Sequence, residues 1–448
     1  MDIFGLLPQF GSALGMLAAF VVALSVIVAV HEYGHYIVAR WSGIKADVFS
    51  LGFGPVLFSR VDRRGTRWQV AALPFGGYVK FMGDADAASG KDSAAIAATA
   101  PDKLRETMHG APLWARTATV AAGPVFNFIL SIVIFTAVIL AQGKLAEPLQ
   151  VGALKPLPGQ GITLQPGDTV LDIAGTHMPG YEDGAAFDAF TAALPDRQVM
   201  EYSVLRDGER LTVMGPHPLP PIVTSLVPQS AAYRAGIKVG DVILGVNGAA
   251  ITSFSQLKDI VESSNGATLK LDVWRDGAER SLNLTPRRVD EPQQDGGFST
   301  DWRIGIAGGW AFEPGTVHAS PVEALEAGVK QTYAVAAGSV SGLYYMITGA
   351  ISSCNMSGPI GIAQASGAMA SQGAENFIWF IAVLSTAVGL LNLFPIPVLD
   401  GGHLVFFAYE ALFRKPPSEG ALRVMMSFGL AVILSLMLFA LFNDIWCP

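Results

Sequence analysis

Four stretches of the sequence are apolar for long enough to cross about 30 Å of hydrocarbon. They cover residues 14–38, 117–142, 377–399 and 421–443. Between the second and third stretches the apolar runs are short and separated by Gly and Pro, which is typical of strands in a soluble region. The pattern predicts a polytopic α-helical membrane protein with four transmembrane helices and a large soluble insert. We expect the first stretch to be a retained helix, because no basic segment precedes it and no small-residue cleavage site follows it.

The composition supports this prediction and narrows the possible chemistry. Of the 448 residues, 51% are hydrophobic and only 15% are charged, a balance too apolar for an ordinary soluble chain. The net charge of -8 argues against nucleic acid as a partner. Cys354 and Cys447 are the only cysteines. They could pair if both lay outside the cytoplasm, but we expect two such isolated thiols to be unpaired. A bound metal must therefore be held by His, Asp or Glu.

Lys and Arg in the connecting loops predict the orientation of the spans. They are concentrated between the first two spans, at residues 40–105, and Arg414 and Lys415 lie between the last two. Residues 1–13 and 444–448 contain neither Lys nor Arg. Because cytoplasmic loops carry the excess of Lys and Arg, these two loops are expected inside the cell. Both termini and the long insert are then expected outside the cytoplasm.

The insert contains an internal repeat. The segments GDTVLDIAG (167–175) and VLRDG (204–208) correspond to GDVILGVNG (240–248) and VWRDG (273–277), at offsets of 73 and 69 residues. Each copy also has a helix-like stretch and an Asp-Gly turn that joins two strands. The order of these elements resembles circularly permuted PDZ domains of bacterial envelope proteases. We expect two extracytoplasmic PDZ-like α/β domains, at residues 145–219 and 220–288.

The second copy is the better match to a PDZ domain. Pro228 to Ala232 (PQSAA) stands where such domains carry their peptide-binding turn, whereas the first copy reads Lys155 to Gly159 (KPLPG) there. Peptide or protein C-termini are therefore expected as ligands of the second domain.

The remaining segments complete the predicted organisation. Residues 1–142 would hold the first two helices and, between them, a cytoplasmic-side membrane-associated β-hairpin with strands at 46–53 and 67–73. The Ala-, Asp- and Ser-rich residues 84–102 are expected to form a flexible linker. Residues 289–376 are expected to be a linker followed by a helix on the membrane surface, in contact with lipid. Residues 377–448 would hold the last two helices.

The strongest chemical signal is HEYGH at residues 31–35, inside the first span. His31 and His35 are four residues apart, so on a helix they share one face and can bind one ion. Glu32 follows His31 directly and can act on a water molecule held at that site. Ionisable residues within a span are costly and by default mark function. The alternative explanation is a satisfied polar cluster between helices.

Catalytic zinc takes three protein ligands and keeps one position open, so a third ligand is required. His31 lies nine residues before Arg40, and hence about 14 Å along the helix from the cytoplasmic boundary. Asp400, in NLFPIPVLDGG at the cytoplasmic end of the third span, arrives at nearly the same depth. The prolines of this segment would end the helix and turn the carboxylate inward. Asp400 is therefore the expected third ligand. The remaining candidates are the other acidic residues and the other histidines, of which His403 is the runner-up: His109, His177, His217, His318 and His403.

The two motifs and the tandem PDZ-like insert between them resemble the site-2 protease family of intramembrane zinc metalloproteases, and within it the bacterial RseP group. GPVFN at 123–127 and LPFGGYVK at 73–80 support the resemblance. It implies that His31, His35 and Asp400 bind zinc, that Glu32 is the catalytic base and that Asn392 supports substrate binding. Further substrate contacts are expected from neighbouring motif residues: Pro395, Pro397, Gly76 and Gly77.

The resemblance also implies the substrates. They would be pre-trimmed single-span proteins of a bacterial inner membrane, such as anti-sigma factors, or remnant signal peptides. Because a helical substrate must unwind to be cut, the hairpin could bind it as an added strand, or could serve only in packing. The periplasmic PDZ-like pair would either exclude untrimmed substrates or deliver trimmed ones.

Two other functions are weaker explanations of the sequence. A non-catalytic membrane adaptor that binds envelope proteins through its PDZ-like domains would leave three ionisable residues in lipid without a purpose. A transporter would require more spans or inverted repeats, and the sequence contains neither.

Overall fold

The computed structural model describes residues 13–85, 99–101, 103–159, 161–180, 184–227, 230–292 and 297–446. The chain forms two compact units. The first, which we call the helical unit, comprises Met1–Ile139, Pro321–Tyr344 and Met356–Pro448. The second, the β-rich unit, comprises Leu140–Ser320 and Tyr345–Asn355.

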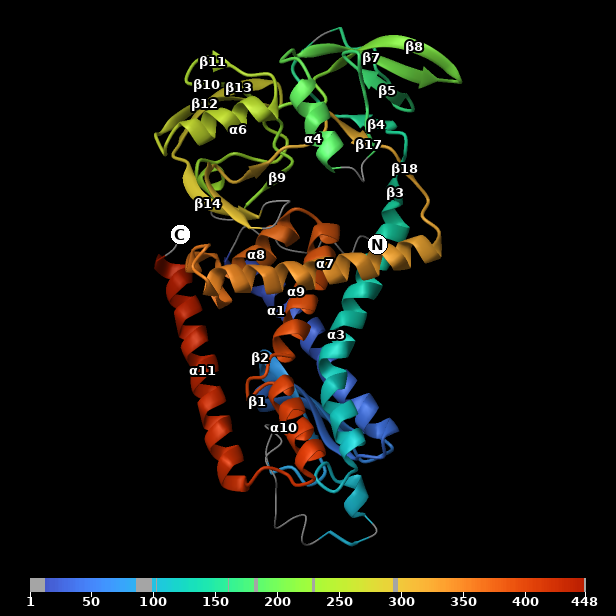
Figure 1. Cartoon of the computed structure of the whole chain (residues 1–448), viewed down its shortest axis with the longest axis vertical. Coiled ribbons are helices and arrows are strands. Elements are labelled where there is room, and N and C mark those ends of the chain that lie inside the picture. The colour runs from blue at the N-terminus through green and yellow to red at the C-terminus, as the bar shows by residue number, and fades with distance from the viewer. Residues whose placement is uncertain are drawn as a thin grey trace. The chain divides into compact units, whose positions relative to one another are not determined.

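Four helices of the helical unit are long and apolar enough to cross a membrane, as the sequence predicts. They are α1 (Ala13–Trp41), α3 (Leu113–Gln142), α9 (Ala374–Asn392) and α11 (Glu419–Trp446) (Figure 1). The third span is shorter than expected, because α9 ends at Asn392 and the chain then turns through a segment that contains Pro395 and Pro397. A separate helix that the sequence analysis did not predict, α10 (Asp400–Phe413), follows this turn.

The segment between α1 and α3 folds into a small antiparallel sheet of β1 (Ala46–Val61) and β2 (Arg67–Phe81). The predicted hairpin is present, but it is more elaborate than two short strands. Residues 48–51 pair with 77–80 on one side and with 67–70 on the other, and 56–61 pair with 67–71. Both strands thus bend back, which gives four segments in the order 77–81, 46–51, 67–71 and 56–61. The short 3₁₀ turn η2 (Leu104–Glu106) precedes α3.

Aromatic side chains attach this sheet to α1. The rings of Phe49 and Trp68 stack at 4.3 Å, and the ring of Tyr36 on α1 meets Trp68 edge-on at 5.0 Å. Both Tyr36 and Phe49 are buried. The sheet is therefore fixed against the helix half that carries the HEYGH motif.

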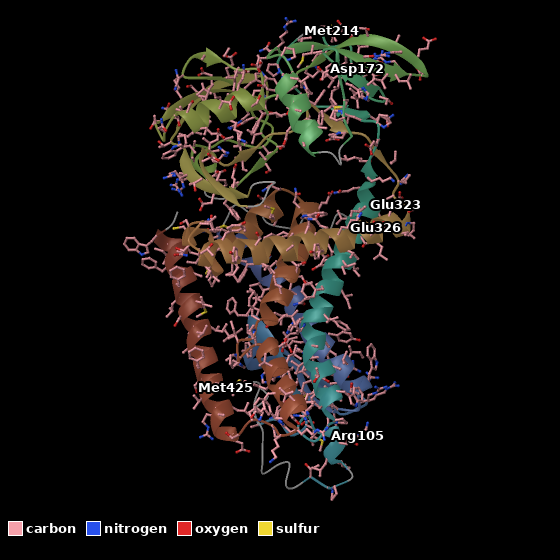
Figure 2. The ribbon with its side chains drawn as sticks, in the orientation of Figure 1. Arg105, Asp172, Met214, Glu323, Glu326 and Met425 are labelled. Atoms are coloured by element: carbon pink, nitrogen blue, oxygen red, sulfur yellow. The ribbon has the colours of Figure 1, made fainter. Side chains whose placement is uncertain are left out.

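A long helix, α7 (Pro321–Ile347), has two contrasting faces. Its small residues Ala324, Gly328 and Thr332 are buried, and Gly328 lies against Thr136 of α3. Large apolar side chains elsewhere on the helix are exposed, namely Val322, Leu325, Val329 and Tyr333. Figure 2 labels the acidic residues Glu323 and Glu326 on the same helix. This amphipathic character fits a helix at a membrane surface, which stays a prediction. A shorter helix, α8 (Pro359–Ser371), precedes α9, after the 3₁₀ turn η3 (Ser353–Asn355).

The repeat predicted in the insert is present in the β-rich unit as two similar modules. The first has the sheet order β6-β5-β7-β8 and the second the order β11-β10-β12-β13. The strands of the first are β5 (Thr169–Ile173), β6 (Thr176–His177), β7 (Val199–Arg206) and β8 (Glu209–Pro216), with helix α4 (Gly184–Ala193). Those of the second are β10 (Val242–Val246), β11 (Ala249–Ala250), β12 (Leu269–Arg275) and β13 (Ala278–Leu284), with helices α5 (Ala231–Arg234) and α6 (Phe254–Ser263).

An equivalent buried ion pair recurs in both modules. Arg206 donates two hydrogen bonds to Asp168 at 2.6 and 2.7 Å, and Arg275 donates two to Asp241, both at 2.6 Å. Burial would raise the pKa of Asp168, but the hydrogen bonds from Arg206 outweigh it and hold that pKa below its ordinary value. The repeated GD and RDG motifs therefore make the same structural contact in each module.

Residues beyond 288 complete both modules, so the second module extends past the boundary expected from the sequence. Ile304 belongs to the core of the second module and Phe312 to that of the first. The strands β14 (Arg287–Pro292) and β15 (Phe298–Arg303) pair with each other. Short pairs close the fold: β16 (Ile306–Ala307) with β9 (Ser225–Leu226), β17 (Phe312–Pro314) with β4 (Val151–Leu154), and β18 (Thr316–Val317) with β3 (Lys144–Leu145).

Three other expectations concern segments that lie partly outside the described residues. Cys354 is disulfide-bonded, so the expectation of unpaired thiols is wrong for this residue, while Cys447 lies outside the described residues. Most of the linker at 84–102 also lies outside them. Of the expected peptide-binding turn, Pro228 and Gln229 are not described, and Ser230 caps the short helix α5.

Candidate metal centre

The two histidines of HEYGH lie one turn apart on the buried face of α1. Each is 9% exposed, so both imidazoles are shielded from the surroundings of the helix. Their rings meet edge-on with centroids 4.7 Å apart, and their Nε2 atoms are separated by 3.1 Å. Two nitrogen lone pairs therefore converge on one point, as the spacing of four residues predicts.

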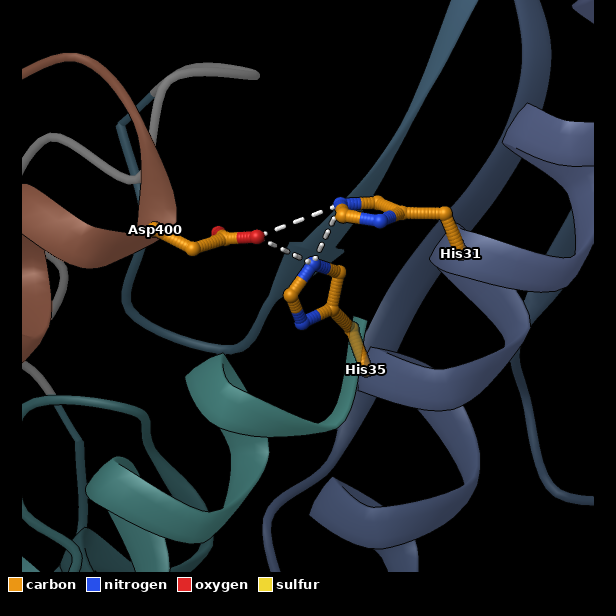
Figure 3. Close-up of side chains that lie close together, drawn as sticks. All are labelled: His31, His35 and Asp400. Atoms are coloured by element: carbon orange, nitrogen blue, oxygen red, sulfur yellow. Dashed lines mark hydrogen bonds and ion pairs between the residues drawn. The ribbon is translucent and has the colours of Figure 1, made fainter. Parts of the chain in front are cut away.

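Asp400 completes this cluster from the opposite end of the sequence. Its Oδ2 atom lies 3.2 Å from Nε2 of His31 and 3.5 Å from Nε2 of His35 (Figure 3). Asp400 is the first residue of α10, and the glycine after it is required by packing. A methyl group on Gly401 would overlap the carbonyl oxygens of Leu393 and Phe394. Close packing of this turn against the start of α10 thus fixes the position of the Asp400 carboxylate.

The three ligand atoms fit a tetrahedral metal ion. With bonds of about 2.0–2.1 Å, two ligands of a tetrahedral zinc are about 3.3 Å apart, close to the 3.1, 3.2 and 3.5 Å measured here. Oδ2 of Asp400 is buried and has no hydrogen-bond partner in the described part of the chain, which a bound cation would explain. Two imidazoles and one carboxylate are also the ligand types that zinc accepts. Within the described ranges, the structure groups Asp400 with the two histidines and leaves His403 out.

Helix α3 forms the wall behind the histidines. A methyl group on Gly123 would overlap the rings of both His31 and His35, so only glycine permits this approach. Nδ1 of His35 lies 2.8 Å from the backbone oxygen of Thr119, and Nδ1 of His31 lies 3.2 Å from the side-chain amide of Asn127. The sequence analysis gave no role to these α3 residues. The available signal was GPVFN, which places a polar Asn127 in the middle of a span.

Glu32 lies between α1 and the β-sheet. Gly77 in β2 faces it, since a methyl group there would be 3.1 Å from Cγ of Glu32. Glu32 directly follows His31 on α1, within the same turn that carries the two histidines. A carboxyl group is therefore present next to the histidines in the sequence and next to a sheet segment in space, and its expected role as the base stays a prediction.

The other predicted site residues lie at the end of α9, in the turn before α10 and in β2. Asn392 is the last residue of α9, and its amide donates to the backbone oxygen of Val388 at 3.1 Å. Pro397 contacts α11, where a methyl group on Gly429 would be 3.1 Å from the proline ring. Gly76 lies against the ring of Phe53, with a backbone φ of +143°. Their expected part in substrate binding stays a prediction, as does that of Pro395.

An ion pair holds the helix that presents Asp400. Arg116 of α3 donates two hydrogen bonds to Glu410 of α10, at 3.1 and 2.6 Å. The guanidinium also lies 5.3 Å from the ring centre of Phe407, on the same helix. Both ions are largely shielded, with side chains 14% and 19% exposed. The pair ties α10 to the helix that backs the histidines.

Comparison with known proteins gives a consistent result along nearly the whole chain. Residues 19–436 match the profile of Peptidase family M50. The chain is 35% identical to a protein of Agrobacterium fabrum named as a zinc metalloprotease, over 97% of each chain. A Rhizobium meliloti protein with a similar name is also 35% identical, over 95% of each chain. Protease RseP of Yersinia pestis is 32% identical, over 97% of this chain and 99% of that protein.

One solved structure is similar to a small part of the chain. It is the PDZ domain of an SdrC-like protein from Listeria monocytogenes, 20% identical, which covers 20% of this chain and 86% of that one at a TM-score of 0.17.

Proposed function

Because the chain belongs to Peptidase family M50, the site-2 proteases, and is a zinc metalloprotease of the membrane, we propose that it cleaves substrates within the bilayer at the cluster of His31, His35 and Asp400. The observation that carries this proposal is the convergence of two imidazole nitrogens and one carboxylate oxygen beside Glu32, on helices long enough to span a membrane.

The ligands and the base have separate tasks in the proposed reaction. His31, His35 and Asp400 would hold the zinc ion, which when bound polarises a peptide carbonyl and activates water. Glu32 would accept a proton from the attacking water and later donate it to the leaving amine. The reaction thus adds water across the peptide bond, and the carboxyl group of Glu32 is restored at the end. Both histidines are buried against α3, which holds their rings in place.

The β-sheet offers a way to hold an unwound substrate. Among the residues that the structure describes, 77–81 pair only with 46–51 and so form an outer segment of the sheet. Gly77 in this segment faces Glu32. An extended substrate that paired with this edge would have its backbone groups satisfied, which a bilayer cannot do. It would also run past Glu32. We propose this edge, rather than the outer segment 56–61, as the substrate-binding strand.

The preferred substrates of the proposed protease are transmembrane segments of pre-trimmed single-span proteins of the anti-sigma-factor type, or remnant signal peptides. We propose that the two modules of the β-rich unit are PDZ-like domains that act on such substrates outside the membrane. Their shared strand order and equivalent Asp–Arg pairs support a common origin of the two.

Removal of the metal is expected to stop cleavage reversibly. Treatment of the purified protein with a zinc chelator in detergent should bring cleavage of a fluorogenic transmembrane peptide below detection, and added zinc should restore it. The untreated protein and a soluble protease that requires no metal, with the same peptide, are the controls. Cleavage that continued in fully zinc-free protein would refute the metalloprotease assignment at this site.

The proposed orientation places the β-rich unit in the periplasm of a bacterial inner membrane, because Lys and Arg gather in the loops at 40–105 and 414–415. A cysteine introduced at Ser230 should react with a membrane-impermeant maleimide in intact spheroplasts. One introduced at Ala95 should react only after the membrane is opened. The parent protein with both native cysteines replaced is the control, and the reverse labelling pattern would overturn the orientation.

A further inference from the structure

Asn127 is a buried amide that touches the candidate metal centre without belonging to it. It lies in α3, its side chain is fully buried, and its amide is 3.2 Å from Nδ1 of His31. An amide inside a membrane span is costly unless it makes specific contacts. The contact with His31 is therefore the reason to look for a function of Asn127.

The chemistry of His31 determines which end of the amide must face it. Nε2 of His31 points at His35 and Asp400, so Nε2 is the nitrogen that would bind zinc. Its other nitrogen, Nδ1, then carries the proton and must donate it. The oxygen and nitrogen of an Asn amide have nearly the same shape and exchange by a half turn. From this we infer that Asn127 is a positioning residue of the metal centre, whose amide oxygen accepts the Nδ1 proton of His31 and orients that ring for zinc. The inference rests on the proposed function.

An amide suits this position because it can form a hydrogen bond with His31 both in the absence and in the presence of bound zinc. Without zinc, Nε2 of His31 faces the Asp400 carboxylate at 3.2 Å, and the amide nitrogen of Asn127 can donate to the bare Nδ1. With zinc bound, the amide turns and presents its oxygen. A hydrophobic residue of the same size could do neither.

The backbone of Asn127 is held in place by hydroxyl groups from two helices. Its carbonyl oxygen accepts hydrogen bonds from Ser131 of α3 at 3.0 Å and from Ser385 of α9 at 2.9 Å. The Ser131 hydroxyl also contacts the backbone oxygen of Ala382 at 2.8 Å. Gly389 allows α9 to approach the Cβ of Asn127 closely. The side chain is thus supported by rigid elements, as a residue that orients a ligand requires.

The two histidines differ in how they are oriented, which makes the inference testable by mutation. Nδ1 of His35 pairs with a backbone oxygen, that of Thr119, which no substitution removes. Nδ1 of His31 pairs with a side chain. Changing Asn127 should therefore affect the binding of zinc through His31 alone.

The test measures the zinc dissociation constant of the full-length protein in detergent by competition with a chelating dye. Asn127→Leu removes the acceptor at similar volume and should weaken zinc binding about 10–100-fold, the usual effect of losing a partner behind a ligand. Asn127→Asp keeps an acceptor and should stay within about threefold of the original protein. Thr386→Val is the matched control, because Thr386 is equally buried and its hydroxyl donates to Ala382 within α9. This variant should bind zinc normally.

A role in packing alone would give different results. It would lower the melting temperature of the Asn127→Leu protein equally with and without zinc and leave the zinc dissociation constant unchanged, whereas the inference predicts that added zinc raises the melting temperature of Asn127→Leu less than that of the original protein. Should Asn127→Leu fail to fold, Asn127→Ala also lacks the acceptor and is expected to show the same loss. Normal zinc binding by the variants without an acceptor, or equal weakening by Asn127→Asp or Thr386→Val, would overturn the inference while the proposed function stands. An original protein that binds no zinc would overturn both.

Discussion

A Glu32→Gln variant is expected to lose cleavage of a transmembrane substrate by about 10²–10⁴-fold, the usual contribution of a general acid–base. The amide keeps the shape of the side chain beside Gly77 but cannot accept a proton. Glu32 is not one of the three converging ligand residues, so the variant should still hold one zinc per chain. Cleavage rate and metal content, measured on the same preparation, check both parts of this result.

The outcome also separates a protease from the adaptor alternative. A membrane adaptor would bind its partners equally well with Gln at position 32 and would show no cleavage to lose. The Tyr33→Phe variant is a suitable control, because Tyr33 is the next residue on α1 and is 42% exposed on another face of the helix. A Glu32→Gln protein that cleaved at the normal rate would remove Glu32 from the reaction.

An Asp400→Ala variant is expected to lose zinc, whereas His403→Ala should retain it. Removal of Asp400 leaves two of the three ligand atoms, and zinc binding should weaken by more than about 100-fold, beyond the effect of losing an outer partner. His403 lies one turn further along α10, outside the group of converging atoms. Metal content after dialysis, and the zinc dissociation constant of each variant, are the measurements.

These two variants test the ligand assignment directly, because they change neighbouring residues of one helix. Loss of zinc in His403→Ala with retention in Asp400→Ala would reverse the assignment made from sequence and geometry. Loss in both would indicate that α10 itself had been disturbed. An undisturbed α10 should keep the ion pair between Glu410 and Arg116, so the presence of this pair in each variant would show that the helix is intact.

The parts of the fold that follow from local pattern were predictable from the sequence. Long apolar stretches predict spanning helices whatever their surroundings, and the spacing of His31 and His35 places both rings on one face. Asp400 could be matched to them because the charge pattern predicts the direction of two spans, and a similar depth then follows from the rise of a helix. The repeated GD and RDG motifs likewise indicated two similar modules.

The parts that depend on contacts between distant segments could not be predicted in this way. Residues 48–51 pair on both edges, yet their sequence is that of an ordinary short strand, so the bent four-segment sheet was missed. Phe312 packs into the core of the first module, although the four-stranded sheet of that module ends at Pro216. No local feature of the sequence around Phe312 indicates this contact. Asn127 was read only as part of a motif, because its role depends on the face of α3 that meets His31.

The ligand atoms of the metal centre are contributed by opposite ends of the polypeptide. His31 and His35 lie in the first span, and Asp400 is reached only after the insert and the third span. A growing chain that has not yet been translated past Asp400 therefore has two of the three ligands that a catalytic zinc site requires. Such a chain, although its first helices are already in the bilayer, cannot assemble the centre. If the proposed ligands hold the zinc, the order of synthesis keeps the centre incomplete until the chain has been translated past Asp400.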